Sequence, residues 1–250
     1  MSNIRYRMLA LDMDGTVLNK RQEISENNRK WIKKAADAGM IVSFATGRGI
    51  QNVIDYVEDL GLDTPIITCN GSEVWRRPHE LLSRHLIDAS VIQQLRQLAL
   101  QHDSWYWGYA VEGLFRKDDW EENSEHFNWL KFGFYTEEKD KLQHIKETVQ
   151  EWDLFEITNS HPDNIELNPK GISKASGLKE ICETIGISMD EVAAAGDSLN
   201  DLAMIQQVGL GVAMGNAQEE VKKAAKRMTL TNEEDGVAHL IKSYLLNSNE

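Results

Sequence analysis

The sequence predicts an α/β protein with a doubly wound, mostly parallel, Rossmann-like core sheet and an inserted, smaller α/β domain. Three observations lead to this fold class. Short apolar runs alternate with helical patterns in the first and last thirds of the chain, the texture changes in the middle, and acidic loops follow two of the apolar runs. Alternating strands and helices are typical of parallel βαβ units, and such sheets bind ligands at the carboxyl ends of their strands.

The first third of the chain contains three predicted strands. Arg7–Met13 is an apolar run that predicts a strand buried on both faces. Ser25 can cap a helix that ends at Gly39. The other elements expected here are strands at Ile41–Ala45 and Pro65–Cys69 and a helix over about 50–60.

The last third returns to the same alternation. Strands are expected at Val192–Ala195 and Gly209–Ala213, each an apolar run before a polar loop. The helices predicted in this part are Ser173–Ile185, Asp201–Val208, Ala217–Ala225 and Val237–Leu246.

The middle of the chain has a different texture. Helices are predicted at Ala89–Gln101 and Glu138–Trp152, with aromatic-rich short strands between them, and five of the seven tryptophans lie in this segment. We therefore predict two domains, a core formed by residues 1–82 and 166–250 and an α/β domain inserted over 83–165.

Composition narrows the range of partners. The formal net charge of −13 argues against nucleic acid or an anionic membrane surface, since both require basic patches. No segment approaches the roughly 20 apolar residues that span a bilayer, and the N-terminus lacks the apolar stretch of a signal peptide. The spacing of Cys69 and Cys182 is not that of a metal site, which favours reduced, packed thiols. A cytoplasmic monomer or homodimer is expected.

Two acidic clusters follow predicted strands. Asp12 and Asp14 come after the first strand, and Asp197 and Asp201 come after the strand at 192–195. If the two strands are neighbours, four carboxylates meet at one sheet edge, where their repulsion requires a cation. This arrangement predicts Mg²⁺ and an anionic substrate. The alternatives are a plain Asp-Gly turn at the first cluster and a helix N-cap at the second, although capping and metal binding are compatible.

Two further sites could bind an anion. Thr46 and Gly47 follow the second strand, and a hydroxyl beside a free N–H suits a phosphate oxygen, although Thr-Gly is as often a helix-capping turn. Lys174 lies at a predicted helix start. A lone lysine is usually a solvated surface charge, and at a helix N-terminus it opposes the dipole, an objection that a nearby anion removes.

Together these residues resemble the haloacid dehalogenase superfamily. The match consists of Asp-Met-Asp-Gly-Thr at 12–16, Thr46, Lys174 and Gly-Asp-Ser-Leu-Asn-Asp at 196–201, in that order. Each motif alone is weak, but the four in this order are specific.

The subfamily is indicated by two further segments and by the place of the insertion. Gly211–Ala217 and Glu234–Val237 are similar to the Cof-type phosphatases of the superfamily. The interval between Asp12 and Thr46 is barely one crossover, whereas the interval from Thr46 to Lys174 is long. The resemblance therefore implies a type-two cap, an α/β lid that closes over the site.

The resemblance also implies roles for the motif residues. Asp12 would be the nucleophile that forms an aspartyl-phosphate, and Asp14 the general acid/base that protonates the alkoxide and then takes a proton from water. Mg²⁺ would be held by the Asp12 carboxylate, the Asp14 backbone carbonyl and Asp197, while Asp201 would orient Lys174 or a metal-bound water. The remaining phosphate oxygens would be bound by Thr46, the Gly47 N–H, Lys174, Asn200 and the Met13 backbone N–H.

The implied activity is Mg²⁺-dependent hydrolysis of small phosphomonoesters, with sugar phosphates expected as substrates. The alternatives are a phosphomannomutase-like phosphomutase, a non-catalytic phospho-ligand sensor and a receiver-type switch. Aromatic residues of the inserted domain could contact the leaving group, although most aromatics of a small domain form its own core. The candidates are Trp105, Tyr106, Trp107, Tyr109, Trp129 and Phe132.

Overall fold

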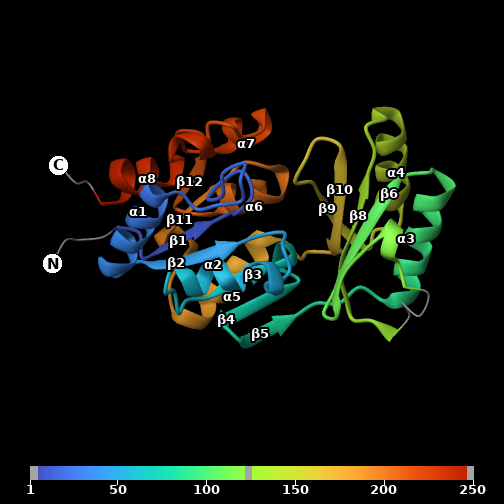
Figure 1. Ribbon diagram of the computed structural model, residues 1–250, viewed down its shortest axis with the longest axis horizontal. Helices are drawn as coiled ribbons and strands as arrows, with labels where there is room; N and C mark the ends of the chain where they lie inside the picture. Colours follow the sequence, from blue (N-terminus) through green and yellow to red (C-terminus); the bar gives the residue numbers. More distant parts are fainter. Residues whose placement is uncertain (1–4, 122–125, 247–250) are drawn as a thin grey trace.

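The computed structural model describes residues 5–121 and 126–246 and has two parts, each built around its own β-sheet (Figure 1). The larger sheet has eight strands in the order β13-β12-β11-β1-β2-β3-β4-β5. Neighbouring strands from β13 to β3 are parallel, while β4 and β5 are antiparallel additions. The strands are β1 (Met8–Leu11), β2 (Ile41–Ala45), β3 (Ile66–Thr68), β4 (Glu73–Arg77), β5 (Glu80–Arg84), β11 (Val192–Gly196), β12 (Leu210–Ala213) and β13 (Arg227–Met228).

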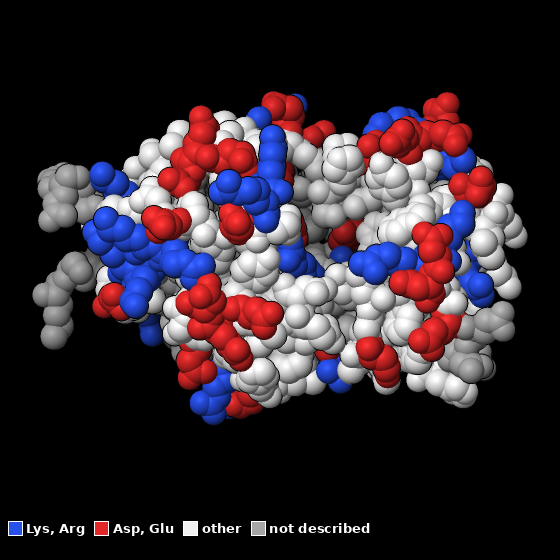
Figure 2. All heavy atoms as spheres, in the orientation of Figure 1, with Lys and Arg blue, Asp and Glu red and all other residues white. Residues whose placement is uncertain are grey.

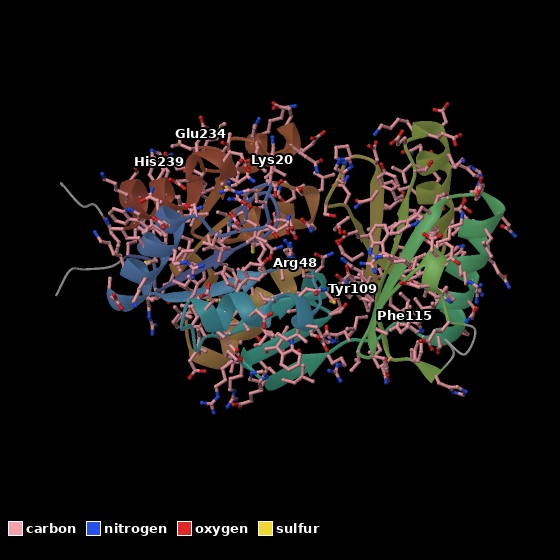
Figure 3. All side chains as sticks on the ribbon, in the orientation of Figure 1. Lys20, Arg48, Tyr109, Phe115, Glu234 and His239 are labelled. Atoms are coloured by element: carbon pink, nitrogen blue, oxygen red, sulfur yellow. The ribbon has the colours of Figure 1, made fainter. Side chains whose placement is uncertain are left out.

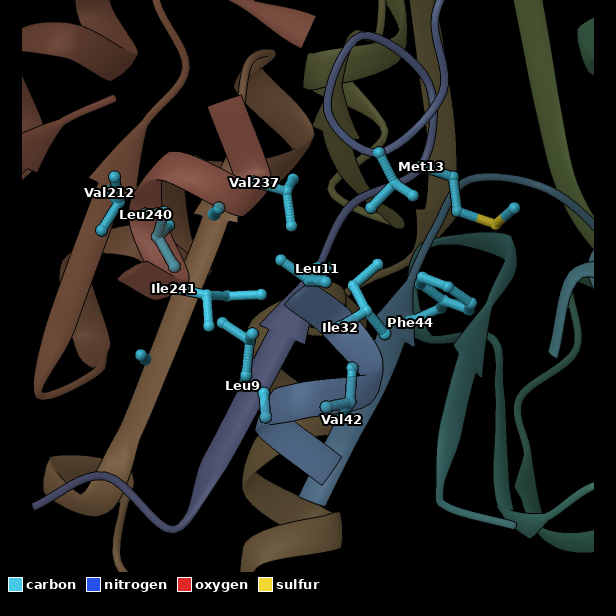
Figure 4. Close-up of a cluster of buried hydrophobic side chains, with 14 of the residues drawn as sticks. Leu9, Leu11, Met13, Ile32, Val42, Phe44, Val212, Val237, Leu240 and Ile241 are labelled. Atoms are coloured by element: carbon cyan, nitrogen blue, oxygen red, sulfur yellow. The ribbon is translucent and has the colours of Figure 1, made fainter. Parts of the chain in front are cut away.

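Helices cover both faces of the large sheet. Leu9 and Leu11 of β1 belong to a hydrophobic cluster that includes α1 (Glu26–Asp37), and Figure 4 shows them beside side chains of that helix. Met8 belongs to a second cluster, which includes α5 (Lys174–Ile185). Alternate residues of one strand are thus buried on opposite faces, so the predicted doubly wound α/β class is confirmed. The other helices of this part are α2 (Ile54–Asp59), α6 (Leu199–Gln207), α7 (Glu219–Ala224) and α8 (Gly236–Leu240).

Some elements differ from the sequence prediction. The hairpin of β4 and β5 was not predicted, because its strands are rich in charged side chains, as is common at sheet edges. The first strand ends at Leu11, before the acidic loop, and not at Met13. The helix expected over about 50–60 begins with a 3₁₀ turn at Ile50–Asn52. The predicted closing helix is divided into α8 and a π-helical turn at Ile241–Leu245.

The smaller sheet has five antiparallel strands in the order β7-β6-β8-β10-β9. Two helices cover the face turned away from the large sheet (Figure 1). Strand β10 belongs to this sheet as far as Pro169, and the division into 1–82 with 166–250 and 83–165 stays a proposal. The elements are α3 (Ala89–Gln101), β6 (Trp105–Ala110), β7 (Gly113–Arg116), β8 (Trp129–Tyr135), α4 (Lys139–Glu151), β9 (Phe155–Thr158) and β10 (Asn164–Pro169).

Both cysteines, Cys69 and Cys182, are buried free thiols. Within the described residues, no helix combines the length and the apolar character that crossing a membrane requires.

Gly71 lies against the start of α5, so we expect its substitution to have a large effect on the stability of the fold. Its φ is +102°, and a Cβ there would overlap the carbonyl oxygen of Ser173, the residue that caps α5. Gly71→Ala should lower the free energy of unfolding by about 2–4 kcal/mol, measured by urea denaturation, because backbone strain and overlap add. Gly61→Ala is the matched control, since Gly61 also has a positive φ but no heavy atom within 4 Å of the new Cβ. Equal losses for both variants would contradict this explanation.

Candidate active site

The two acidic clusters lie together because β1 and β11 are neighbours in the large sheet. The main-chain N–H of Asp12 donates to the carbonyl of Ala195 over 3.0 Å, just beyond the paired strands. Carboxylate oxygens of Asp12, Asp197 and Asp201 all lie within 4.8 Å of one another. The structure thus brings three of the four predicted carboxylates into one group at the carboxyl end of the sheet, while Asp14 has a different partner.

Lys174 lies between two of these carboxylates. It is the first residue of α5, its side chain is fully buried, and its Nζ lies 2.6 Å from Asp12 Oδ1 and 2.7 Å from Asp201 Oδ1. Burial acts to lower the pKa of Lys174, but the two carboxylates outweigh burial and raise that pKa above its usual range. The lysine is therefore charged and offsets part of the repulsion between the acids.

Asp201 belongs to the first turn of α6 and also makes the capping contacts expected there. Its Oδ2 accepts hydrogen bonds from the main-chain N–H groups of Asp197 and Ser198, at 3.0 and 3.1 Å. Its Oδ1 accepts from Lys174. The helix-capping interpretation of this motif is therefore correct, and it coexists with the carboxylate group.

Asp197 has features of a cation ligand. Its Oδ1 is buried and has no hydrogen-bond partner among the residues that the structure describes. Burial and the charge of Asp201 raise the pKa of Asp197 to about 7. Gly15, with φ +77°, packs so closely that a Cβ would overlap the Asp197 carboxylate. An orphaned carboxylate oxygen beside two other carboxylates fits a hard, oxygen-preferring cation such as Mg²⁺.

Asp14 is paired with Arg48. Arg48 Nε lies 2.8 Å from Asp14 Oδ2 and Nη2 lies 2.6 Å from Asp14 Oδ1, so the guanidinium holds both oxygens. Burial acts to raise the pKa of Asp14, but the hydrogen bonds and the charge of Arg48 outweigh it and hold that pKa below its usual value. Asp14 is therefore a carboxylate in this arrangement.

The predicted phosphate-binding residues have different surroundings. Thr46 is fully buried at the end of β2, and its Oγ1 accepts from the Arg48 N–H at 3.2 Å. Asn200 donates to Asn70 Oδ1 at 3.2 Å, while its own Oδ1 is buried without a partner within the described ranges 5–121 and 126–246. The side chain of Met13 lies in the hydrophobic core near Phe44 (Figure 4). Only its backbone is therefore available to a ligand.

A cavity of about 240 Å³ lies where these residues meet the smaller sheet. On the core side it is lined by Asp12, Asp14, Gly47 and Asn200. Figure 2 shows acidic and basic side chains next to each other in the hollow between the two parts. The remaining lining residues are Arg48, Trp107, Tyr109, Lys131, Ser160, Glu166 and Ser198.

Most of these additional residues were not predicted as parts of the site. Figure 3 shows Arg48 of the core and Tyr109 of the smaller sheet near the boundary between the two parts. Arg48 directly follows Thr46-Gly47, and this adjacency was the available signal. Lys131 and Glu166 carry no local sequence signal. Of the six aromatic candidates, two line the cavity, and Tyr106, Trp129 and Phe132 are buried in the core of the smaller part.

We expect substitution of the buried Lys174 to lower the stability of the fold by an amount that depends on pH. In Lys174→Met, Asp12 and Asp201 would stay buried without a countercharge, so we expect the free energy of unfolding to fall by about 3–5 kcal/mol near pH 8 in metal-free buffer. Unpaired buried carboxyls have a higher pKa when folded than when unfolded, so their destabilising effect declines as the pH falls toward about 5.

Urea denaturation at the two pH values measures this difference. Lys170→Met is the control, because Lys170 pairs with Asp153 at the surface and its loss should cost less than about 1 kcal/mol at either pH. A pH-independent deficit in Lys174→Met would contradict the assignment of the countercharge.

The comparisons with known proteins agree with this geometry. The family model described as haloacid dehalogenase-like hydrolase matches residues 9–119 and 112–241. The chain is 43% identical over 244 residues to the 5-amino-6-(5-phospho-D-ribitylamino)uracil phosphatase YcsE of Bacillus subtilis, covering 98% of both chains. It is 32% identical to YitU, a phosphatase of the same name and organism, covering 95% of this chain and 97% of that one.

A solved structure of a haloacid dehalogenase-like hydrolase from B. subtilis superimposes with a TM-score of 0.87. It has 26% identity and covers 96% of this chain and 100% of that one. The superfamily and subfamily predicted from the motifs are thus confirmed. The chain belongs to the haloacid dehalogenase-like hydrolases.

Proposed function

We propose that this hydrolase is a Mg²⁺-dependent phosphatase of small phosphomonoesters that forms an aspartyl-phosphate on Asp12. The observation that carries the proposal is the carboxylate group of Asp12, Asp197 and Asp201 within 4.8 Å, with Asp197 Oδ1 unpartnered in the described part of the chain. Lys174 offsets only part of the repulsion within this group, so a bound divalent cation would complete it, and the added positive charge would attract an anionic substrate.

The residues that would hold Mg²⁺ are the Asp12 and Asp197 carboxylates and the Asp14 backbone carbonyl. When bound, the ion would act as a Lewis acid on a phosphate oxygen and lower the repulsion between the substrate and Asp12. Lys174, Thr46 and the Gly47 N–H would bind other phosphate oxygens as charge is redistributed in transfer, together with Asn200 and the Met13 N–H.

The protein residues supply the covalent and proton-transfer steps. An Asp12 oxygen attacks phosphorus, the bond from phosphorus to the ester oxygen breaks, and the alkoxide leaves with a proton from Asp14. Water then attacks the phosphorus of the aspartyl-phosphate, gives its proton to Asp14 and releases phosphate and the Asp12 carboxylate. Asp201 would keep Lys174 in place throughout, because it holds the second side of the ammonium.

The contact with Arg48 favours one of the two proposed roles of Asp14, that of general base, over the other, that of general acid. Paired with Arg48, Asp14 is ionised and suited to accept a proton from water. To protonate the leaving group, Asp14 must first be released from Arg48 and take up a proton. The substrate phosphate is a natural competitor for the guanidinium, because arginine binds phosphate in the same bidentate way as carboxylate.

The relatives support small-metabolite substrates. Their names include phosphatases of 5-amino-6-(5-phospho-D-ribitylamino)uracil and of pyridoxal phosphate. Both compounds and common sugar phosphates therefore belong in a substrate panel. A cytoplasmic location and a monomer or homodimer remain predictions, as do the phosphomutase and phospho-ligand sensor alternatives.

The panel assay tests the function with matched variants. Phosphate release in the presence of Mg²⁺ should fall to background in Asp12→Asn and with EDTA, and Asp14→Asn should lose about 10²–10⁴ in kcat. Acid-quenched wild type should carry phosphate on the peptide that contains Asp12, identified by mass spectrometry. Isomerised sugar phosphate without release would favour the mutase, and tight binding without turnover the sensor. Turnover that survives Asp12→Asn would overturn the proposal.

The Arg48 contact predicts a change in pH dependence. In Arg48→Gln the pKa of Asp14 should rise, because the charge that holds it low is lost. The limb of the kcat/KM profile due to Asp14 should therefore move to higher pH, with p-nitrophenyl phosphate as the common substrate. Arg29→Gln serves as the control, since Arg29 pairs with Asp59 outside the cavity. If this limb of the kcat/KM profile has the same pH midpoint in Arg48→Gln as in the wild type, Asp14 is not the group that determines it.

A further inference from the structure

One face of the smaller sheet forms the roof of the cavity. Side chains alternate along β8, so Lys131 faces the cavity while Phe132 is buried among the helices behind the sheet. Trp107 and Tyr109 of the neighbouring strand line the cavity as well. Gly133 leaves room for the indole of Trp107 to lie against the strand, where a Cβ would overlap it. The roof therefore consists of aromatic side chains around a polar centre.

The polar centre is the ion pair of Lys131 and Glu166. Lys131 Nζ lies 3.0 Å from Glu166 Oε2, and their side chains are only 3% and 4% exposed. Burial disfavours the charged form of both side chains, but the attraction between them is stronger. The pKa of Lys131 therefore lies above its usual value, and the pKa of Glu166 lies below its usual value. Both groups are thus charged near neutral pH.

Most of the hydrogen-bonding capacity of this pair is already used. Lys131 also donates to the Gly47 carbonyl at 2.8 Å, which leaves one of its three N–H groups. Glu166 accepts from Asn70 at 2.6 Å and from Ser160 at 2.6 Å, in addition to Lys131. A carboxylate has about four lone-pair positions, so about one remains. Within the described residues, the pair can still offer one donor and one acceptor.

We propose that the Lys131–Glu166 pair selects phosphate esters whose leaving group is uncharged and carries a hydroxyl near the roof, and discriminates against leaving groups with a carboxylate or a second phosphate. The inference rests on the proposed phosphatase function and names the substrate class of that same site. A hydroxyl both donates and accepts, so it can satisfy Lys131 and Glu166 together.

An anionic leaving group meets the opposite situation. Its oxygens can only accept, so the remaining position on Glu166 would stay unsatisfied and two negative charges would face each other in a buried site. Among the described lining residues, the other cation is Arg48. It cannot compensate for the added charge, because it is held by Asp14 or, in the proposed reaction, by the phosphate that is transferred.

The test compares two ligands that differ in a single group. D-glucitol 6-phosphate ends in a hydroxymethyl group, and 6-phospho-D-gluconate ends in a carboxylate. Binding of each is measured by calorimetry with Mg²⁺ in the Asp12→Asn background, so the result does not depend on turnover. We expect the glucitol ester to bind about tenfold tighter or more. Hydrolysis of p-nitrophenyl phosphate by the wild-type chain separately tests the phosphatase function.

Two variants should move this preference in opposite directions. Glu166→Gln leaves Lys131 without its carboxylate, so the preference for the neutral ligand should shrink or reverse. Lys131→Met leaves Glu166 without its cation, so the preference should grow. The double variant, which is neutral like the native pair, should return toward the native ratio and guards against effects of misfolding. Glu138→Gln, which breaks the surface pair with Lys141, should leave the ratio unchanged.

The outcomes separate clearly. Opposite shifts in the single variants, with recovery in the double variant, support charge selection by the pair. Equal binding of the two ligands by the Asp12→Asn protein, or shifts in the same direction for both single variants, would overturn the proposed selection. If selective binding is found but p-nitrophenyl phosphate is not hydrolysed, the phosphatase proposal fails while the selectivity of the roof stands.

Discussion

The whole site depends on the buried ammonium of Lys174, held between Asp12 and Asp201. Removing these groups from water is costly. The cost is offset because Lys174 pairs with both carboxylates and because Asp201 also accepts two main-chain N–H groups. The three residues come from the ends of β1 and the starts of α5 and α6. Their contact therefore fixes how distant segments of the chain meet at the sheet edge.

The boundary between the two parts is built differently from the interiors. The sheets are packed with apolar side chains, but the boundary consists largely of hydrogen bonds. Ser72 donates to the Leu130 carbonyl, Gln51 to the Val111 carbonyl and the Asn200 N–H to the Asn159 carbonyl. Polar contacts of this kind can exchange with water without exposing a hydrophobic core. The boundary thus suits a cover that opens and closes over the cavity.

The sequence predicted the acidic clusters at one sheet edge because parallel strands end on the same side, so residues that follow such strands are brought together whatever their separation. Lys174 was predicted through the resemblance to the superfamily, since a lone lysine at a helix start is by itself more typical of a surface charge. The partner of Asp14 was not predictable, since Arg48 could equally have faced solvent or phosphate. The pair of Lys131 and Glu166 depends on strand order in the smaller sheet, which the aromatic-rich segments do not reveal. The hairpin of β4 and β5 was missed for a similar reason, because charged edge strands lack an apolar pattern.

The smaller sheet and its helices are attached to the core by two short segments, 85–88 and 170–173, between β5 and α3 and between β10 and α5. A body fastened at two points keeps one easy rotation, about the line that joins them. Swinging about this axis would carry the strand bearing Glu166, yet that strand is joined by only four residues to the helix that begins with Lys174. The segment about which the smaller part would rotate therefore lies directly beside Lys174, the buried cation of the site.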